Sequence, residues 1–202
     1  MIWKDEIVSS QTAAGDTLSL AELTRSFFGE AMTMDQMLAL LEAEPRVPST
    51  PPAAAALWVG SVGYETHKDA GEFAQHLRAS GVERLIDVRQ LPISRRRGYA
   101  KTALGLAMAA VGIEYVHIKA LGNPKEFRDL YKSGRVDEGR RGYEEHLLSQ
   151  RMEALHDLVP LLREKASALM CVEHTAATCH RTVILEALRE KLGLDLEVAE
   201  IS

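Results

Sequence analysis

The sequence predicts an α/β fold, with a mostly parallel sheet, helices on both faces, and an N-terminal helical extension. The first observation behind this prediction is that short apolar runs alternate with amphipathic stretches of helical spacing from residue 57 to the C-terminus. That alternation is typical of a parallel sheet covered by helices on both sides. The second is that Gly81 and Gly112 each follow a helical stretch, at the position where helices commonly end.

Residues 1–44 form the predicted helical extension. Ser19 and Thr33 are candidate caps for two short amphipathic helices. Two such helices bury too little apolar surface to fold alone, so we expect them to pack on the main domain or on a second chain. They are therefore the candidate interface of a homodimer. Residues 45–56 are rich in proline and alanine and predict a semi-extended linker.

The predicted α/β domain spans residues 57–202. The expected strands cover residues 57–60, 85–88, 113–118, a stretch ending at 171, and 194–201. The expected helices cover residues 69–79, 101–111, 125–131, 143–150, 152–165 and about 181–192. Because the helices follow the strands one by one, we expect ligand-binding residues at the carboxyl ends of the strands.

Composition narrows the function classes. The formal net charge of -5 means that contact with nucleic acid or phosphate requires a local basic patch. Two cysteines give no disulfide framework, which favours a cytoplasmic protein. We expect no membrane association, since no apolar run reaches the roughly 18 residues that a membrane span needs.

Four motifs recur in order along the predicted domain. They are Val-Gly-Ser at residues 59–61, Leu-Ile-Asp-Val-Arg at 85–89, Gly-Ile-Glu-Tyr-Val-His-Ile at 112–118, and Cys-Val-Glu with Cys-His-Arg between 171 and 181. This set resembles the DUF488 family, a domain of unknown function, over about residues 57 to 200. The resemblance implies an α/β fold with a site, and it assigns no reaction. Gly60 and Ser61 stand in the turn where the family pattern carries a Gly-His-Ser-like sequence, and they are candidate substrate-binding residues.

Residues 171–181 carry the main candidate catalytic groups. Cys171 ends an apolar strand, and Cys179 precedes a predicted helix start, so either thiol is a candidate nucleophile. Glu173 is the candidate general acid or base. His180 and Arg181 lie where the free N–H groups of a helix start favour anion binding, so they are candidate substrate-binding residues.

A second candidate group follows the strand at residues 85–88. Asp87 and Arg89 alternate onto one face, where they can pair with each other or hold a ligand together. Asp87 is a candidate catalytic residue and Arg89 a candidate anion ligand. Ser94 and Arg96 belong to a loop with three consecutive arginines, whose guanidinium groups suit phosphate or carboxylate.

The sequence disfavours a metal site and indicates no particular cofactor. Residues 171, 174, 179 and 180 supply cysteine and histidine, but adjacent ligands at 179 and 180 would point apart on a helix. The first hypothesis is an enzyme that binds a phosphorylated or nucleotide-like anion at the strand ends. The alternative is a non-catalytic module that binds nucleic acid or another anion through the Arg-rich loop at residues 94–101.

Overall fold

The computed structural model describes residues 56–202, and the α/β fold predicted from the sequence is confirmed there. The predicted N-terminal helices, most of the linker and the candidate dimer interface lie outside the described residues. Within them, no helix is both long enough and apolar enough to cross a membrane.

The core of the domain is a five-stranded sheet in which all strand pairs are parallel. Its strand order is β3-β2-β4-β1-β5. The strands are β1 (Leu57–Gly63), β2 (Arg84–Asp87), β3 (Glu114–His117), β4 (Ser167–Cys171) and β5 (Leu196–Ile201). The central strands β2 and β4 are entirely buried, as expected for strands covered on both faces.

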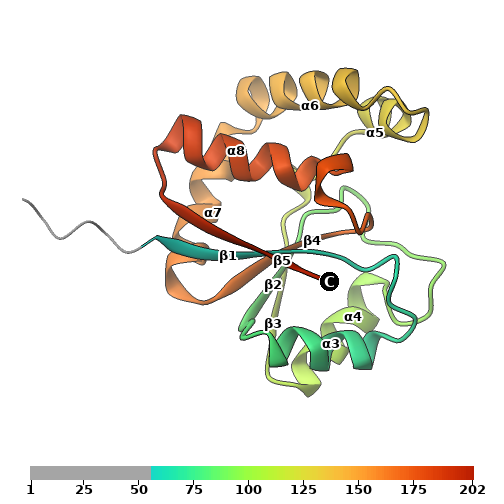
Figure 1. Ribbon diagram of the computed structural model, residues 1–202. Coiled ribbons are helices and arrows are strands. Elements are labelled where there is room, and N and C mark those ends of the chain that lie inside the picture. The colour runs from blue at the N-terminus through green and yellow to red at the C-terminus, as the bar shows by residue number, and fades with distance from the viewer. Residues whose placement is uncertain (1–55) are drawn as a thin grey trace, which may run out of the picture. The chain divides into compact units, whose positions relative to one another are not determined.

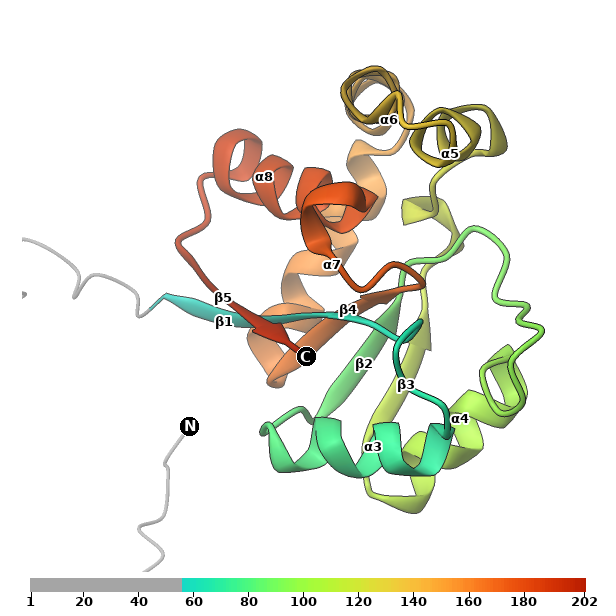
Figure 2. The same ribbon diagram turned by 45° about the vertical axis from the view of Figure 1, so that its right-hand side comes forward.

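Helices cover both faces of this sheet (Figures 1 and 2). One face packs against α3 (Ala70–Ala79) and α4 (Lys101–Ala110). The other packs against α6 (Val136–Gln150), α7 (Met152–Glu164) and α8 (His180–Leu192). The helix α5 (Lys125–Lys132) lies beside α6, and two short 3-10 turns, η1 (Lys119–Leu121) and η2 (Ala176–Thr178), complete the connections.

Local chemistry explains the ends of the helices. The Asp69 carboxylate accepts hydrogen bonds from the backbone N–H groups of Gly71 and Glu72, which caps α3. Gly193 ends α8 in the left-handed conformation, with φ of 64°.

The helix α6 begins seven residues earlier than the sequence predicts, at residue 136 instead of 143. The misleading signals are Gly139 and Gly142, which usually weaken a helix. Here each glycine allows a close approach of a ring from α5. A Cβ at Gly139 would lie 2.8 Å from the Tyr131 ring, and one at Gly142 would lie 2.6 Å from the Phe127 ring. The glycines thus serve the packing of α5 on α6.

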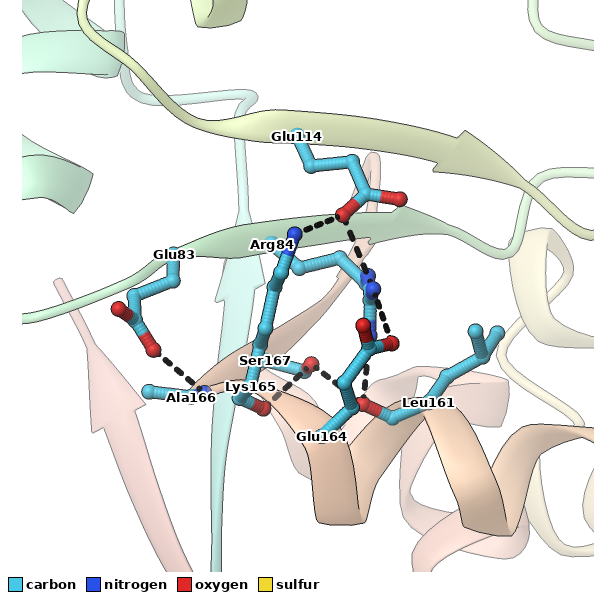
Figure 3. Close-up of polar contacts among 8 residues, drawn as sticks. All are labelled: Glu83, Arg84, Glu114, Leu161, Glu164, Lys165, Ala166 and Ser167. Carbon is cyan, nitrogen blue, oxygen red and sulfur yellow. Dashed lines mark hydrogen bonds and ion pairs between the residues drawn. The ribbon is translucent and has the colours of Figure 1, made fainter. Parts of the chain in front are cut away.

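Arg84, the first residue of β2, stabilises the amino end of the sheet (Figure 3). Its side chain is 2 % exposed and pairs with Glu114 of β3 and Glu164 of α7, at 2.9 and 2.7 Å. It also donates to the Leu161 carbonyl at 2.7 Å. One buried guanidinium therefore joins two strands and a helix.

After the neighbouring strands β2 and β4, the chain turns to opposite faces of the sheet. The chain leaves β2 toward α4 on one face and leaves the neighbouring β4 toward α8 on the other. Such a switch in direction opens a crevice between the two loops, where α/β proteins commonly bind ligands.

Candidate functional site

A pocket of about 440 Å³ occupies this crevice. Segments from three parts of the chain line it, namely residues 89–93 after β2, residues 123–132 around α5, and residues 171–180 between β4 and α8. This volume is sufficient for a small organic ligand. The lining joins segments that are distant in sequence, as expected where loops meet at the strand ends.

Four chemically reactive side chains meet on one side of the pocket, and we call them the cysteine cluster. They are Cys171, Glu173, Cys179 and His180, and one potential ligand atom from each lies within 4.8 Å of all the others. Glu173 Oε2 lies 3.0 Å from the Cys171 sulfur and 3.3 Å from the Cys179 sulfur. Both sulfurs lie 3.7 Å from His180 Nδ1. The carboxylate and the imidazole thus each contact both sulfurs.

The backbone around Cys179 explains this convergence. Cys171 is the last residue of β4, and η2 returns the chain so that Cys179 becomes the N-cap of α8. Cys179 has an extended backbone, with φ of -128° and ψ of 145°, and is not part of the helix. The expectation that residues 179 and 180 point apart assumed that both were helical, and in the structure their Sγ and Nδ1 atoms approach to 3.7 Å.

His180 has a fixed ring orientation. Its Nε2–H donates to the Val88 carbonyl at 2.9 Å, so Nδ1 faces the two sulfurs. The ring is 4 % exposed and meets the Tyr143 ring edge-on. The end of β2 therefore sets the position of an imidazole that belongs to α8.

Mutual contact shifts the pKa values of the cluster. Burial alone would raise the pKa of Cys179, but the hydrogen bond from Cys171 and the charge of His180 hold it well below its usual range. The pKa of Cys171 is raised by its hydrogen bond to Cys179 and by burial. Burial raises the pKa of Glu173, and Cys179 raises it further. The cluster thus favours negative charge on the sulfur of Cys179.

Arg181 holds the backbone of the loop that carries Glu173. It is fully buried and is absent from the pocket lining. Its Nη2 donates to the carbonyls of Glu173 and His174 at 2.8 and 3.3 Å, while Nε and Nη1 have no hydrogen-bond partner. The guanidinium that the sequence suggested as an anion ligand therefore holds the loop that carries Glu173.

Asp87 and Arg89 form a buried ion pair below the pocket. Arg89 Nε and Nη2 both reach the Asp87 carboxylate, with a shortest distance of 2.6 Å. Arg89 Nη1 donates to Tyr64 Oη and to the Tyr99 carbonyl. Burial alone would lower the pKa of Arg89, but Asp87 raises it above its usual range. Arg89 reaches the pocket lining, whereas Asp87 is fully buried and does not.

The remaining residues singled out in the sequence do not line the pocket. Gly60 and Ser61 are buried in the middle of β1, and Ser94 and Arg96 belong to the loop before α4. Arg96 is exposed and donates to the His67 carbonyl at 2.9 Å. The pocket lining includes none of these four residues.

The sequence analysis missed the face of α5 that borders the pocket. Arg128, Tyr131 and Lys132 lie on it, joined by Asn123 from the preceding turn. Arg128 Nε and Asn123 Oδ1 are buried without a hydrogen-bond partner. Burial raises the pKa of Tyr131 to about 12, so its hydroxyl stays neutral and can donate. The spacing i, i+3, i+4 of Arg128, Tyr131 and Lys132 is the signal that could have revealed this face.

The arrangement combines two capacities. The α5 side of the pocket offers two cations, a phenol and an amide to an anion. The opposite side offers two sulfurs, a carboxylate and an imidazole, a set suited to proton transfer, to nucleophilic chemistry or to binding a soft divalent metal.

Comparison with known proteins gives one match. A family model described as "Domain of unknown function DUF488" matches residues 69–188. The matched range runs from the cap of α3 into α8, so it contains the cysteine cluster and the residues that line the pocket. Neither the curated proteins nor the solved structures include a match to this chain.

Proposed function

The chain belongs to the DUF488 family, and from that premise we propose that it is an enzyme acting on a small phosphorylated or nucleotide-like substrate. The observation that carries the proposal is the pocket between β2 and β4. Its lining joins Asn123 and the α5 residues Arg128, Tyr131 and Lys132 with the cysteine cluster. A pocket with convergent polar groups and reactive side chains is the usual form of an active site.

The α5 side is the part that binds the anion in this proposal. Arg128 lacks a partner for a buried Nε, and Asn123 lacks one for a buried Oδ1. Leaving a buried donor such as Arg128 Nε unpaired is costly, so an anion whose oxygen accepts from it gains affinity. Asn123 Oδ1 is an acceptor, so it suits a hydroxyl or amino group of the same ligand. A guanidinium matches the oxygens of a phosphate, and Lys132 adds a second positive charge nearby.

The cysteine cluster supplies the reacting groups in this proposal. Glu173 lines the pocket and is less buried than Cys171, Cys179 and His180, so we assign it to proton transfer. It touches both sulfurs, which keeps its carboxylate in one orientation.

The experiment compares Arg128→Ala with Arg97→Ala, using inorganic phosphate and a nucleoside monophosphate as probes in calorimetry. Arg97 is exposed in the loop at residues 94–101, so it is the matched control. A charged hydrogen bond contributes about 1.5–3 kcal/mol, so Arg128→Ala should weaken binding roughly tenfold to a hundredfold. Arg97→Ala should leave it unchanged.

The opposite result would favour the non-catalytic module. In that case a single-stranded oligonucleotide binds with steep salt dependence, Arg97→Ala weakens it, and Arg128→Ala does not. A protein that binds neither phosphate probe would reject the proposed substrate class.

A further inference from the structure

We propose that Cys171, Glu173, Cys179 and His180 form a binding site for a zinc ion. The inference goes beyond the proposed function, because the ion site can exist whether or not the α5 side binds an anion. It comes from the juxtaposition of four donor atoms from the end of β4, the following loop and the start of α8. Two thiols with an imidazole and a carboxylate are ligands that zinc prefers over harder ions such as Mg²⁺ or Ca²⁺.

Four of the six distances between donor atoms are close to those around a tetrahedral ion, and all six are at most 4.8 Å. Zinc lies about 2.3 Å from sulfur and about 2.0–2.2 Å from nitrogen or oxygen, so sulfur and either partner should be about 3.5 Å apart. Both sulfurs are 3.7 Å from His180 Nδ1. They are 3.0 and 3.3 Å from Glu173 Oε2. Small side-chain adjustments would therefore complete the coordination shell.

The surroundings of His180 support the same assignment. A histidine that binds zinc through one ring nitrogen usually donates its other N–H to a carboxylate or a backbone carbonyl. His180 donates its Nε2–H to the Val88 carbonyl at 2.9 Å and directs Nδ1 at the sulfurs. The ring thus already has the orientation that a metal ligand needs.

Charge balance explains the buried Arg181. Two thiolates and a carboxylate around a divalent ion leave a single net negative charge. Arg181 is fully buried, grips the Glu173 carbonyl, and has two nitrogens without a partner. A buried cation is costly unless an opposite charge compensates it. Within residues 56–202 Arg181 forms no ion pair with a carboxylate, and its charge acts on Cys179, so the cysteine cluster with its bound ion is the counter-charge for Arg181.

The exposure of the ligands indicates how the ion would be used. Cys171, Cys179 and His180 are 5, 2 and 4 % exposed, whereas Glu173 is half-buried and lines the pocket. Three fixed ligands and one that faces the cavity resemble a catalytic zinc site, where a ligand position opens to water or substrate. In the loaded protein both sulfurs are ligands, and Glu173 is the ligand that a substrate oxygen can replace.

The test is a titration of the reduced, full-length, metal-free protein with Co²⁺, which substitutes for zinc and reports sulfur ligands by absorption. We expect one ion per chain, a sulfur-to-cobalt charge-transfer band, intense visible bands of a tetrahedral ion, and loss of all bands when Zn²⁺ is added. Cys179→Ser should weaken Co²⁺ binding at least tenfold and reduce the charge-transfer band. His156→Ala should change nothing, because His156 is exposed on α7 and outside the pocket lining.

A measurement on the wild-type chain covers the case in which Cys179→Ser does not fold. Zn²⁺ should slow alkylation of Cys171 and Cys179 by iodoacetamide at least tenfold. Failure to bind Co²⁺, or equal alkylation with and without Zn²⁺, would overturn the inference. Arg128→Ala separates it from the proposed function, since that variant should lose phosphate binding and keep the full cobalt spectrum.

Discussion

The substitution Gly63→Ala tests how tightly the fold fixes the loop that carries the cysteine cluster. Gly63 ends β1 opposite Cys171 of β4. A Cβ at this position would lie 1.8 Å from the Glu173 carbonyl oxygen and 2.7 Å from the Cα of His174. Contacts of this kind stay above 3.0 Å, so the Glu173 backbone must move away from β1.

Two costs follow from that movement. The Glu173 carbonyl leaves its 2.8 Å hydrogen bond with Arg181, and a bond to a charged donor contributes about 1.5–3 kcal/mol. Crowding a packed interior costs about 1–3 kcal/mol in addition. We therefore expect Gly63→Ala to lower the free energy of unfolding by about 2.5–6 kcal/mol.

Urea denaturation monitored by circular dichroism measures this change, with Gly105→Ala as the control. Gly105 lies inside α4, and the nearest atom to its added Cβ would be Tyr115 Cδ1 at an ordinary 3.5 Å. There alanine should stabilise the helix by about 0.5–1 kcal/mol. If Gly63→Ala is as stable as the wild type, the loop is not held as we describe and the argument for a preformed cluster loses its basis.

Two further substitutions test the buried ion pairs, and urea denaturation measures both. Arg84→Ala should lower the free energy of unfolding by about 2–4 kcal/mol, because it removes a buried side chain and its bond to the Leu161 carbonyl. The control Lys165→Ala breaks a half-exposed pair with Glu114 and should lower it by less than about 1 kcal/mol. Equal costs would contradict the role given to Arg84. Asp87→Asn should cost about 3–5 kcal/mol because it leaves a buried guanidinium without its counter-charge. A cost below about 1 kcal/mol would show that the pair does not anchor the end of β2.

The sequence predicted the architecture because local patterns determine it. Short apolar runs became buried parallel strands, and glycines marked the ends of helices. The predicted start of α6 was wrong because Gly139 and Gly142 are required for packing against rings of α5, which no local pattern reveals. The sequence also placed both cysteines in one loop at a strand end, where the structure has them.

The sequence did not predict which arginines of the site are buried and which face the pocket. Arg89 was a candidate anion ligand because it shares a face with Asp87 at a strand end, and Arg181 because it lies at a predicted helix start with free N–H groups. In the structure Arg89 pairs with Asp87, and Arg181 donates to backbone carbonyls through Nη2 alone, while its Nε and Nη1 have no partner. The free cations of the pocket, Arg128 and Lys132, come from α5, which is distant in sequence from the motifs. The convergence of Cys179 with His180 depended on one extended residue at the N-cap, a conformation that composition does not specify.

The central claim is that one pocket unites an anion-binding face on α5 with the cysteine cluster. A crystal structure of the protein grown in inorganic phosphate tests it most directly. Our account predicts a phosphate between β2 and β4 that contacts Arg128 and lies beside Glu173. Phosphate bound only at the loop of residues 94–101, with the pocket holding water alone, would contradict it.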